Sequence, residues 1–517
     1  MSGEYASTLV TDEATLGERV ASTTIGLGLL VFVLSVLAVA RVVTEEASVL
    51  GIGLYDFLAG GLLAMGLGVG VVGVGSALGR VATTPDETPG TVTAGAFGLI
   101  AAAVVWLSTA QIGAFGPLGG VPAGLLAGAV TFVGLGLLPE DLGSTLPTVA
   151  VAVAVSGAVL TNLLTPAWLW DPEWLSAGFS GSMTIPVLLA VAALLTAWAG
   201  AKAYGGYGSE GRQAGAYLLV ALNALGMLAV LLAIILFIVT KGVAPAFEGF
   251  SLSPFDWPFV LNGYSFRPDV VNGVFPAIVG TIYLVVGATL TGVPVAVAAA
   301  VFLTEYAEQG PFVGAVEIAT NGLWSTPSVV YGLFGYAFLV PRLGGTTSLL
   351  SGMLVLGFML MPLCLITSRE AIKAVPDEYR DASAALGVSQ WETVKSVVVP
   401  AAMPGIVTGV ILGVGRIAGE TAPILLVMSG GLRDDAPNVL GSFEFTSAPP
   451  FVANDALLQS SPALPYQLYA TITSGVSAEN AVEYGWGTAF VLLVVVLSFY
   501  AVGIATRMYF RRRLNYE

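Results

Sequence analysis

The segment REAIKAVPDEYRDASAALGVSQWETVKSVVVPAAMP, residues 369–404, decides the fold, because it is mostly polar or small and lies between two apolar segments of membrane length. Its pattern predicts two short helices joined by a glycine. The first helix has Pro376 in its opening turn, with Asp377 behind it where an anionic side chain meets the positive helix end. We expect this helix to stop at Gly387.

The second helix begins at Ser389, which forms a Ser-x-x-Glu capping box with Glu392, and it is expected to run into Pro400. Both helices carry small or apolar residues at three- and four-residue spacing. Such a face suits docking into a groove on another protein, and the alternative is a loop that lies on the lipid. The face consists of Tyr379, Ala382, Ser383 and Leu386 on the first helix and Trp391, Val394 and Val398 on the second.

The composition places the whole chain in a membrane. Its 517 residues are 56% hydrophobic and 10% charged, with a mean hydropathy of +0.88, so we expect an all-α polytopic membrane protein without a sizeable soluble domain. The only cysteine is Cys364, which excludes disulfides within the chain and cysteine-rich metal sites. The absence of histidine removes His-based catalysis, and no metal site is expected.

The net charge of −15 is carried by the polar loops. An acidic surface of this kind is typical of halophile proteins, and it argues against nucleic-acid binding. It is only a weak argument against anion transport, because the Debye length at about 1 M salt is only about 3 Å.

Twelve segments are long and apolar enough to cross a hydrocarbon core of about 30 Å. A polar stretch at residues 201–213 divides these segments into two groups. It predicts an N-terminal region of unassigned role at 1–205 and a second domain at 206–517. The spans of the N-terminal region contain almost no charged residues. The predicted spans are 21–43, 57–82, 93–114, 118–138, 146–168 and 183–203 in the first half, and 213–240, 275–303, 313–340, 347–368, 405–429 and 485–506 in the second.

The distribution of basic residues predicts the orientation. If the N-terminus is cytoplasmic, most Lys and Arg side chains also fall on the cytoplasmic side, which satisfies the positive-inside rule. Both termini and the segment 369–404 are then cytoplasmic in a multi-pass protein of the cell membrane. In the loop between the spans at 275–303 and 313–340, Glu305 and Glu308 are expected to be solvated charges.

Three segments resemble a known family: the segment 369–404 and two others, at 405–427 and 323–338. The segment 369–404 resembles the EAA loop of importer-type ABC permeases, which binds the ATPase subunit. GIVTGVILGVGRIAGETAPILLV at 405–427 and LWSTPSVVYGLFGYAF at 323–338 resemble permease subunits of phosphate ABC importers of the PstA type. The positions that match the EAA loop are Asp381, Ala382, Ser383, Gly387, Val397, Val399 and Pro400, where Asp replaces Glu, Ser replaces Ala and Val replaces Ile and Leu.

The resemblance extends over residues 275–513 and implies a type I ABC importer permease (MetI-like) fold for the C-terminal six spans. It also implies a second permease of the PstC type, an ATPase dimer of the PstB type and an extracellular phosphate-binding protein of the PstS type. None of the four lysines follows a Walker A pattern, so we expect this chain to bind no cofactor and the partner ATPase to use ATP. The residues expected to dock the ATPase are Tyr379, Asp381, Ala382, Ser383, Leu386, Gly387, Trp391 and Pro400.

One predicted helix carries the transport chemistry. Gly405, Gly409 and Gly413 recur every four residues, followed by Arg416 and then Glu420, so one helical face holds small residues and two opposite charges. A charge near the membrane midplane is costly, which makes Arg416 a functional candidate. Its planar fork of donors fits a phosphate, and Glu420 would neutralise it when the path is empty.

Further polar residues could complete this pathway. Thr421 supplies a hydroxyl, and Pro423 is expected to break or kink the helix. Ser325 and Ser328 could line the same path, although hydroxyls are common in membrane helix packing. The alternative for the charges is a structural Arg416–Glu420 pair that joins two helices.

Two other function classes remain open on the sequence alone. A secondary, ion-coupled transporter would also match twelve spans, but the sequence lacks an evident pair of intramembrane acids. An ABC permease for another oxyanion is the second alternative. The N-terminal region could be a regulatory or assembly module.

Overall fold

The computed structural model describes residues 15–44, 46–81, 83–86, 91–111, 119–172, 174, 178–265, 271–308, 310–447, 451–473 and 481–514. The chain forms two compact units, Met1–Val230 and Leu231–Glu517, and the division falls within helix α8, Gly208–Ala246. The domain boundary predicted at residues 205–206 lies just before this helix and stays a prediction.

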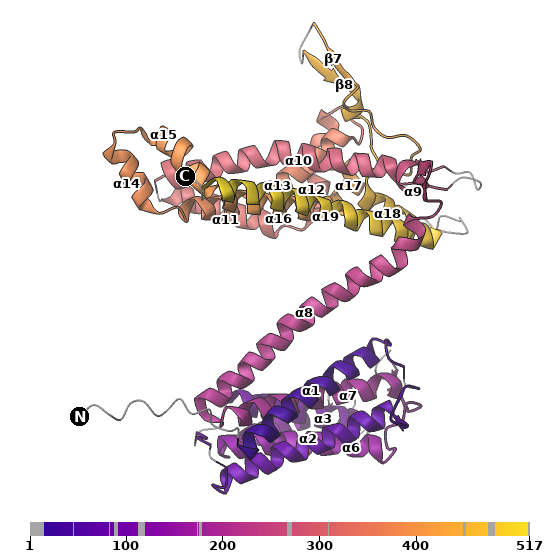
Figure 1. Ribbon diagram of the computed structural model, residues 1–517, viewed down its shortest axis with the longest axis vertical. Helices are drawn as coiled ribbons and strands as arrows, with labels where there is room; N and C mark the ends of the chain where they lie inside the picture. Colours follow the sequence, from indigo (N-terminus) through magenta and orange to yellow (C-terminus); the bar gives the residue numbers. More distant parts are fainter. Residues whose placement is uncertain are drawn as a thin grey trace. The chain divides into compact units, whose positions relative to one another are not determined.

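The N-terminal unit is a bundle of long apolar helices. In Figure 1, α1, α2, α6 and α7 run alongside one another, and α1 contacts α2 and α7 while α3 contacts α5. Leu58, Leu62, Ile185 and Leu189 are fully buried in its core. The helices are α1 (Leu16–Val39), α2 (Leu54–Ala77), α3 (Thr91–Gln111), α5 (Val121–Gly136), α6 (Glu140–Leu160) and α7 (Gly181–Tyr204), and the strand pairs are β1–β2 (Ser48–Val49, Ile52–Gly53) and β3–β4 (Leu169–Trp170, Phe179–Ser180).

The C-terminal unit is organised around α13, which packs against α10, α11 and α16, while α16 also packs against α19. Its helices are α9 (Pro258–Leu261), α10 (Phe275–Val301), α11 (Pro311–Ser325), α12 (Ser328–Phe334), α13 (Leu349–Lys373), α14 (Asp377–Ala385), α15 (Gln390–Thr393), α16 (Val399–Ala418), α17 (Ala422–Val427), α18 (Leu464–Thr473) and α19 (Ala481–Leu514). Short π-helical or 3-10 segments are η1 (Phe302–Tyr306), η2 (Gly335–Leu339), η3 (Val340–Arg342), η4 (Val394–Val398) and η5 (Asp455–Leu458), and the strand pairs are β5–β6 (Ser251–Leu252, Phe255–Asp256) and β7–β8 (Phe443–Phe445, Val452–Asn454).

The helices confirm an all-α polytopic membrane protein. Within the described residues, ten helices are long and apolar enough to span a membrane, or eleven if the pair at 311–325 and 328–342 is one span bent by 102°. The predicted span at 118–138 corresponds to α5, which is a shorter apolar helix of 16 residues. Each predicted span overlaps a helix of the structure, and the expected count of about twelve compares with ten or eleven among the described residues. The span predicted at 405–429 differs in its bounds, because the corresponding helix runs from Gln390 to Ala418.

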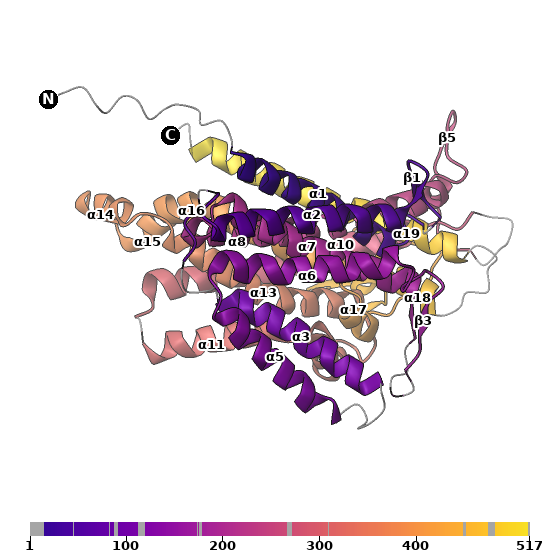
Figure 2. The same ribbon diagram turned by 90° about the horizontal axis from the view of Figure 1, so that it is seen from below.

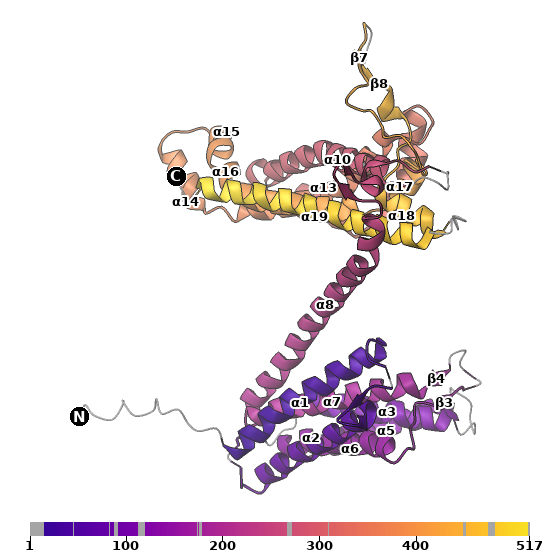
Figure 3. The ribbon, with the colours of Figure 1, turned by 45° about the vertical axis from the view of Figure 1, so that its right-hand side comes forward.

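The decisive segment folds as a helix, a glycine turn and a helix at one end of the C-terminal unit, as Figure 3 shows for α14 and α15. Gly387 has a φ of +74°, a backbone conformation that glycine adopts without steric cost. The Ser389 hydroxyl accepts a hydrogen bond from the backbone N–H of Glu392, as its cap position predicts. The predicted end at Pro400 is wrong, because helical backbone continues without a gap from α15 through η4 into α16, and Pro400 lies inside this helix.

The start of the predicted loop also differs from the structure. Arg369 to Lys373 form the last residues of α13 rather than part of a loop, and Ala374 caps that helix. The polar segment between α7 and α8 is a tight turn in which Tyr207 is fully buried.

Candidate functional site

The guanidinium of Arg416 lies at the C-terminal end of α16, between a carboxylate and an aromatic ring. Its Nε is 4.0 Å from Oε1 of Glu420, and its guanidinium carbon is 4.4 Å from the ring centre of Trp324 on α11. The two charged side chains are 34% and 19% exposed, so neither is sealed in the core. A guanidinium over an indole face is held in orientation by the cation–π attraction while its remaining donors stay available.

The helix ends at this site, which differs from the prediction. We expected Arg416 and Glu420 on one continuous helix, but α16 ends at Ala418 with Gly419 as its cap, and α17 starts at Ala422. Glu420 and Thr421 therefore lie in the non-helical segment between α16 and α17, which interrupts the predicted helix. Pro423 occupies the first turn of α17, where its missing N–H is tolerated, so the break precedes the proline.

The glycine stripe on α16 allows the close approach of α13. A Cβ atom at Gly405 or Gly409 would collide with the Cβ atom of a residue on α13, so these two positions require glycine for this packing, while a Cβ atom at Gly413 would meet the end of a leucine side chain that can move. The opposing side chains are Ala371 at Gly405, Thr367 at Gly409 and Leu360 at Gly413. The predicted role of the stripe is confirmed, and α13 is the neighbouring helix.

Ser325 and Ser328 lie on either side of the bend between α11 and α12. The Ser325 hydroxyl donates to the carbonyl of Gly322 at 3.0 Å, a bond within its own helix. Tyr331 donates to the carbonyl of Leu323 at 2.8 Å and joins the two arms of the bend. The pathway roles of both serines stay predictions.

The predicted docking segment presents a surface on which large apolar side chains lie beside polar and small ones. Tyr379, Leu386 and Trp391 are 51%, 82% and 61% exposed, which is high for large apolar side chains. Asp381 and Ala382 are also exposed. Of the remaining predicted docking residues, Ser383 is buried, Gly387 is exposed in the turn and Pro400 is half-buried in α16.

Arg380 fastens this surface to the end of α10. Its guanidinium binds both carboxylate oxygens of Glu305 in η1, at 2.7 and 3.2 Å, and also donates to the carbonyls of Ile372 and Val375. The hydrogen bond to Glu305 raises the pKa of Arg380 above its ordinary value. Glu305 was expected to be solvated, but its side chain is only 7% exposed; Glu308 is exposed as predicted.

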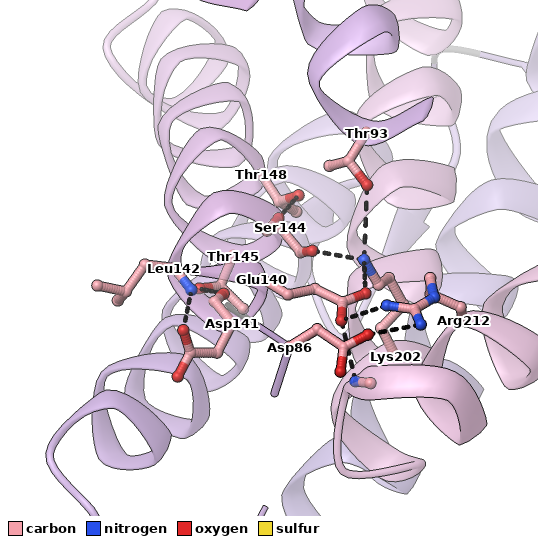
Figure 4. Close-up of polar contacts among 11 residues, drawn as sticks. Asp86, Thr93, Glu140, Asp141, Leu142, Ser144, Thr145, Thr148, Lys202 and Arg212 are labelled. Atoms are coloured by element: carbon pink, nitrogen blue, oxygen red, sulfur yellow. Dashed lines mark hydrogen bonds and ion pairs between the residues drawn. The ribbon is translucent and has the colours of Figure 1, made fainter. Parts of the chain in front are cut away.

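A second polar cluster lies in the N-terminal unit, where almost no interior charge was expected. Figure 4 shows Lys202 of α7 pointing at Glu140 of α6, with 2.9 Å between Nζ and Oε1. Lys202 also donates to the Ser144 hydroxyl at 2.7 Å. The other oxygen of Glu140 accepts from Arg212 at 2.9 Å, and Arg212 pairs with Asp86 at 2.6 Å.

This cluster joins the ends of three helices and is closed to solvent at its centre. Glu140 and Lys202 are each 1% exposed, and the neighbouring Asp141 is equally buried, with its carboxylate accepting from the Ser76 hydroxyl at 2.7 Å. A buried charge is tolerated when it is paired and hydrogen-bonded. The expectation of an uncharged interior is wrong for this end of the bundle.

Sequence comparison gives relatives for the C-terminal unit. Residues 274–516 match the family model described as "Binding-protein-dependent transport system inner membrane component". The chain is 31% identical over 272 residues to the phosphate transport system permease protein PstA of Mycobacterium leprae (strain TN), covering 52% of this chain and 81% of that protein. It is 34% identical to PstA of Xylella fastidiosa (strain Temecula1) over 230 residues, covering 44% of this chain and 73% of the relative.

Among solved structures, the methionine ABC transporter MetNI in an inward-facing conformation aligns with 45% of this chain and 94% of its own, at 15% identity and a TM-score of 0.35. A bacterial ABC transporter involved in the import of the acidic polysaccharide alginate aligns with 56% of this chain and 99% of its own, also at 15% identity and a TM-score of 0.35.

Proposed function

This chain belongs to the PstA-type family of ABC transporter permeases, and from that premise we propose that it is a permease subunit of an ATP-driven importer of inorganic phosphate. The observation that carries the substrate assignment is Arg416 in the last turn of α16, with Glu420 and Trp324 beside it. The relatives named above are phosphate permeases, which supports the same substrate.

Phosphate would bind the guanidinium in place of the carboxylate. Arginine offers a planar fork of donors that matches two phosphate oxygens, and it keeps its charge at any physiological pH. Glu420 is 4.0 Å away, a long ion pair that a tighter anion can displace. Competition from Glu420 keeps phosphate binding weak enough for release, as conduction requires.

The docking surface on α14 and α15 would receive the ATPase. Tyr379, Leu386 and Trp391 supply exposed apolar contacts for a groove on that partner. Arg380 and Glu305 would then transmit its movement to α10, because they tie the docking segment to the end of that long helix. In this arrangement the ATPase hydrolyses ATP, and the permease moves.

The full assembly would contain four kinds of subunit. We propose a heterodimer of this chain with a second permease of the PstC type, an ATPase dimer of the PstB type and an extracellular phosphate-binding protein of the PstS type. The segment 369–404 and both termini would lie on the cytoplasmic side. Orientation can be tested by labelling a cysteine placed at the exposed residue Glu308, in a Cys364→Ala background, from either side of the membrane.

The substrate site is tested by substituting Arg416 in vesicles that contain all four components. Arg416→Gln should abolish phosphate uptake, because the neutral amide cannot pair with the anion, while the ATPase still copurifies. Glu420→Gln should bind phosphate more tightly and release it more slowly, since the competing charge is gone, so both the half-saturating phosphate concentration and the maximal rate of uptake should fall. Arg433→Gln is the matched control, because the Arg433 guanidinium donates to the Ser460 hydroxyl in the segment between α17 and α18. Native-level uptake by Arg416→Gln would contradict the proposed role of this arginine.

A further inference from the structure

A second arginine of the C-terminal unit lies against a cavity that the transport site does not include. The cavity holds about 210 Å³ between α11, α13 and η1, which is many times the space of one water. It lies at the same end of the unit as α14 and α15, where Figure 2 also places α11. Its polar lining residues are Glu317, Thr320 and Asn321 of α11 and Arg369, Glu370 and Lys373 of α13.

Arg369 is the buried charge of this α11–α13 cavity. Its side chain is only 10% exposed, and one guanidinium nitrogen, Nη1, pairs with the carboxylate of Glu317. The Nε atom is buried without a hydrogen-bond partner among the described residues. A buried donor without an acceptor is costly, so Arg369 holds unused capacity for an oxyanion.

Glu317 is the more exposed partner in this pair. Its side chain is 45% exposed, which leaves room for the carboxylate to turn away from Arg369. Lys373 adds a second cation on the cavity wall, and its nearest acid, Glu370, is 3.5 Å away and largely exposed. The charges of the two cations on the cavity wall are thus balanced by two carboxylates, those of Glu317 and Glu370, and both carboxylates are exposed to solvent.

One face of α11 connects this cavity with the site at Arg416. Glu317, Asn321 and Trp324 follow one another at spacings of four and three residues, so they share a face of the helix. Trp324 contacts Arg416, while Glu317 contacts Arg369. Seven residues of helix separate the two contacts by about 10 Å, so two arginines lie in succession along α11.

We propose that the α11–α13 cavity is a second site for a phosphate group, in which Arg369 binds the oxyanion and Glu317 competes for the same guanidinium. The inference rests on the proposed function, which makes this end cytosolic and the ligand inorganic phosphate leaving the permease. Two weak sites in series allow an anion to be passed on without being held. High cytosolic phosphate would then occupy the cavity and slow further import.

The test uses vesicles of the whole assembly that enclose ATP, with the binding protein outside. Initial uptake of radiolabelled phosphate is measured while enclosed phosphate is raised. Arg369→Gln should raise the half-inhibitory concentration of enclosed phosphate at least about tenfold, because a charge-assisted hydrogen bond is lost. Glu317→Gln should lower it, a gain that misfolding would not produce. Glu308→Gln, an exposed acid outside the cavity, should match native protein.

The outcomes separate this inference from the function on which it rests. If native vesicles take up phosphate but all variants share one half-inhibitory concentration, the second site is refuted and the importer stands. If inhibition follows the content of anionic phospholipid instead of enclosed phosphate, the cavity binds a lipid headgroup and the inference is also refuted. If native vesicles take up no phosphate with ATP, the proposed function itself fails.

Discussion

The contact between Arg380 and Glu305 gives a prediction with a calculable size. Arg380→Met removes the guanidinium that binds both oxygens of Glu305, whose side chain is 7% exposed. Breaking a largely buried pair by removing one partner costs about 3 to 5 kcal/mol, because the remaining charge is left uncompensated. Since the contact fastens α14, we expect this cost to appear as local opening of residues 377–385.

Amide hydrogen exchange of the purified chain measures that opening. A loss of about 3 kcal/mol should accelerate exchange in α14 by roughly 100-fold, since about 1.4 kcal/mol corresponds to a factor of ten. The double variant Arg380→Met with Glu305→Met should restore much of the protection, because no buried charge is left unpaired. Lys373→Met is the matched control, and it should change exchange little, since its pair with Glu370 is largely exposed.

Two results would refute this reasoning. One is exchange in α14 of the Arg380→Met variant within about threefold of native, which would mean that the pair does not fasten the segment. The other is a double variant that exchanges as fast as the single variant, because the cost would then come from lost packing rather than from the stranded carboxylate.

Three further predictions concern other parts of the chain. Lys202→Met should lower the free energy of unfolding by about 3 to 5 kcal/mol, because the buried carboxylate of Glu140 would lose one of its positively charged partners. Thermal unfolding of the purified chain, followed by near-ultraviolet circular dichroism, measures this loss. Gly409→Val should cost about 1 to 3 kcal/mol by overpacking against Thr367, and Thr367→Ala should restore part of the loss in the same melting assay. Gly387→Val should strain the turn by about 1 to 2 kcal/mol, because its φ is +74°, and should reduce the ATPase that copurifies with the chain.

Local signals made much of the fold predictable. The long runs of apolar residues located the helices of both units, because a helix that spans the membrane needs about 20 consecutive, mostly apolar residues. The turn at Gly387 and the cap at Ser389 were also predictable, because each depends only on residues a few positions away in the sequence. The glycine stripe on α16 likewise indicated a close helix contact, although its partner α13 was not specified.

Contacts between distant residues were not predictable in this way. Glu305 and Arg380 are 75 positions apart, and no local pattern pairs them. The burial of Lys202 depends on Glu140, which comes from another helix, so the sequence indicated only that Lys202 belongs to a polar stretch between the two halves. The end of α16 at Ala418 was missed because we expected Pro423 to break the helix, whereas the break occurs ahead of it.

The most direct test of the central claim is phosphate uptake into vesicles that contain this chain and its partners, energised in turn by ATP and by ion gradients. The importer account predicts uptake that requires ATP and the ATPase subunit and continues when proton and sodium gradients are collapsed. Uptake driven by an ion gradient without any ATPase subunit would contradict it and would favour a secondary transporter.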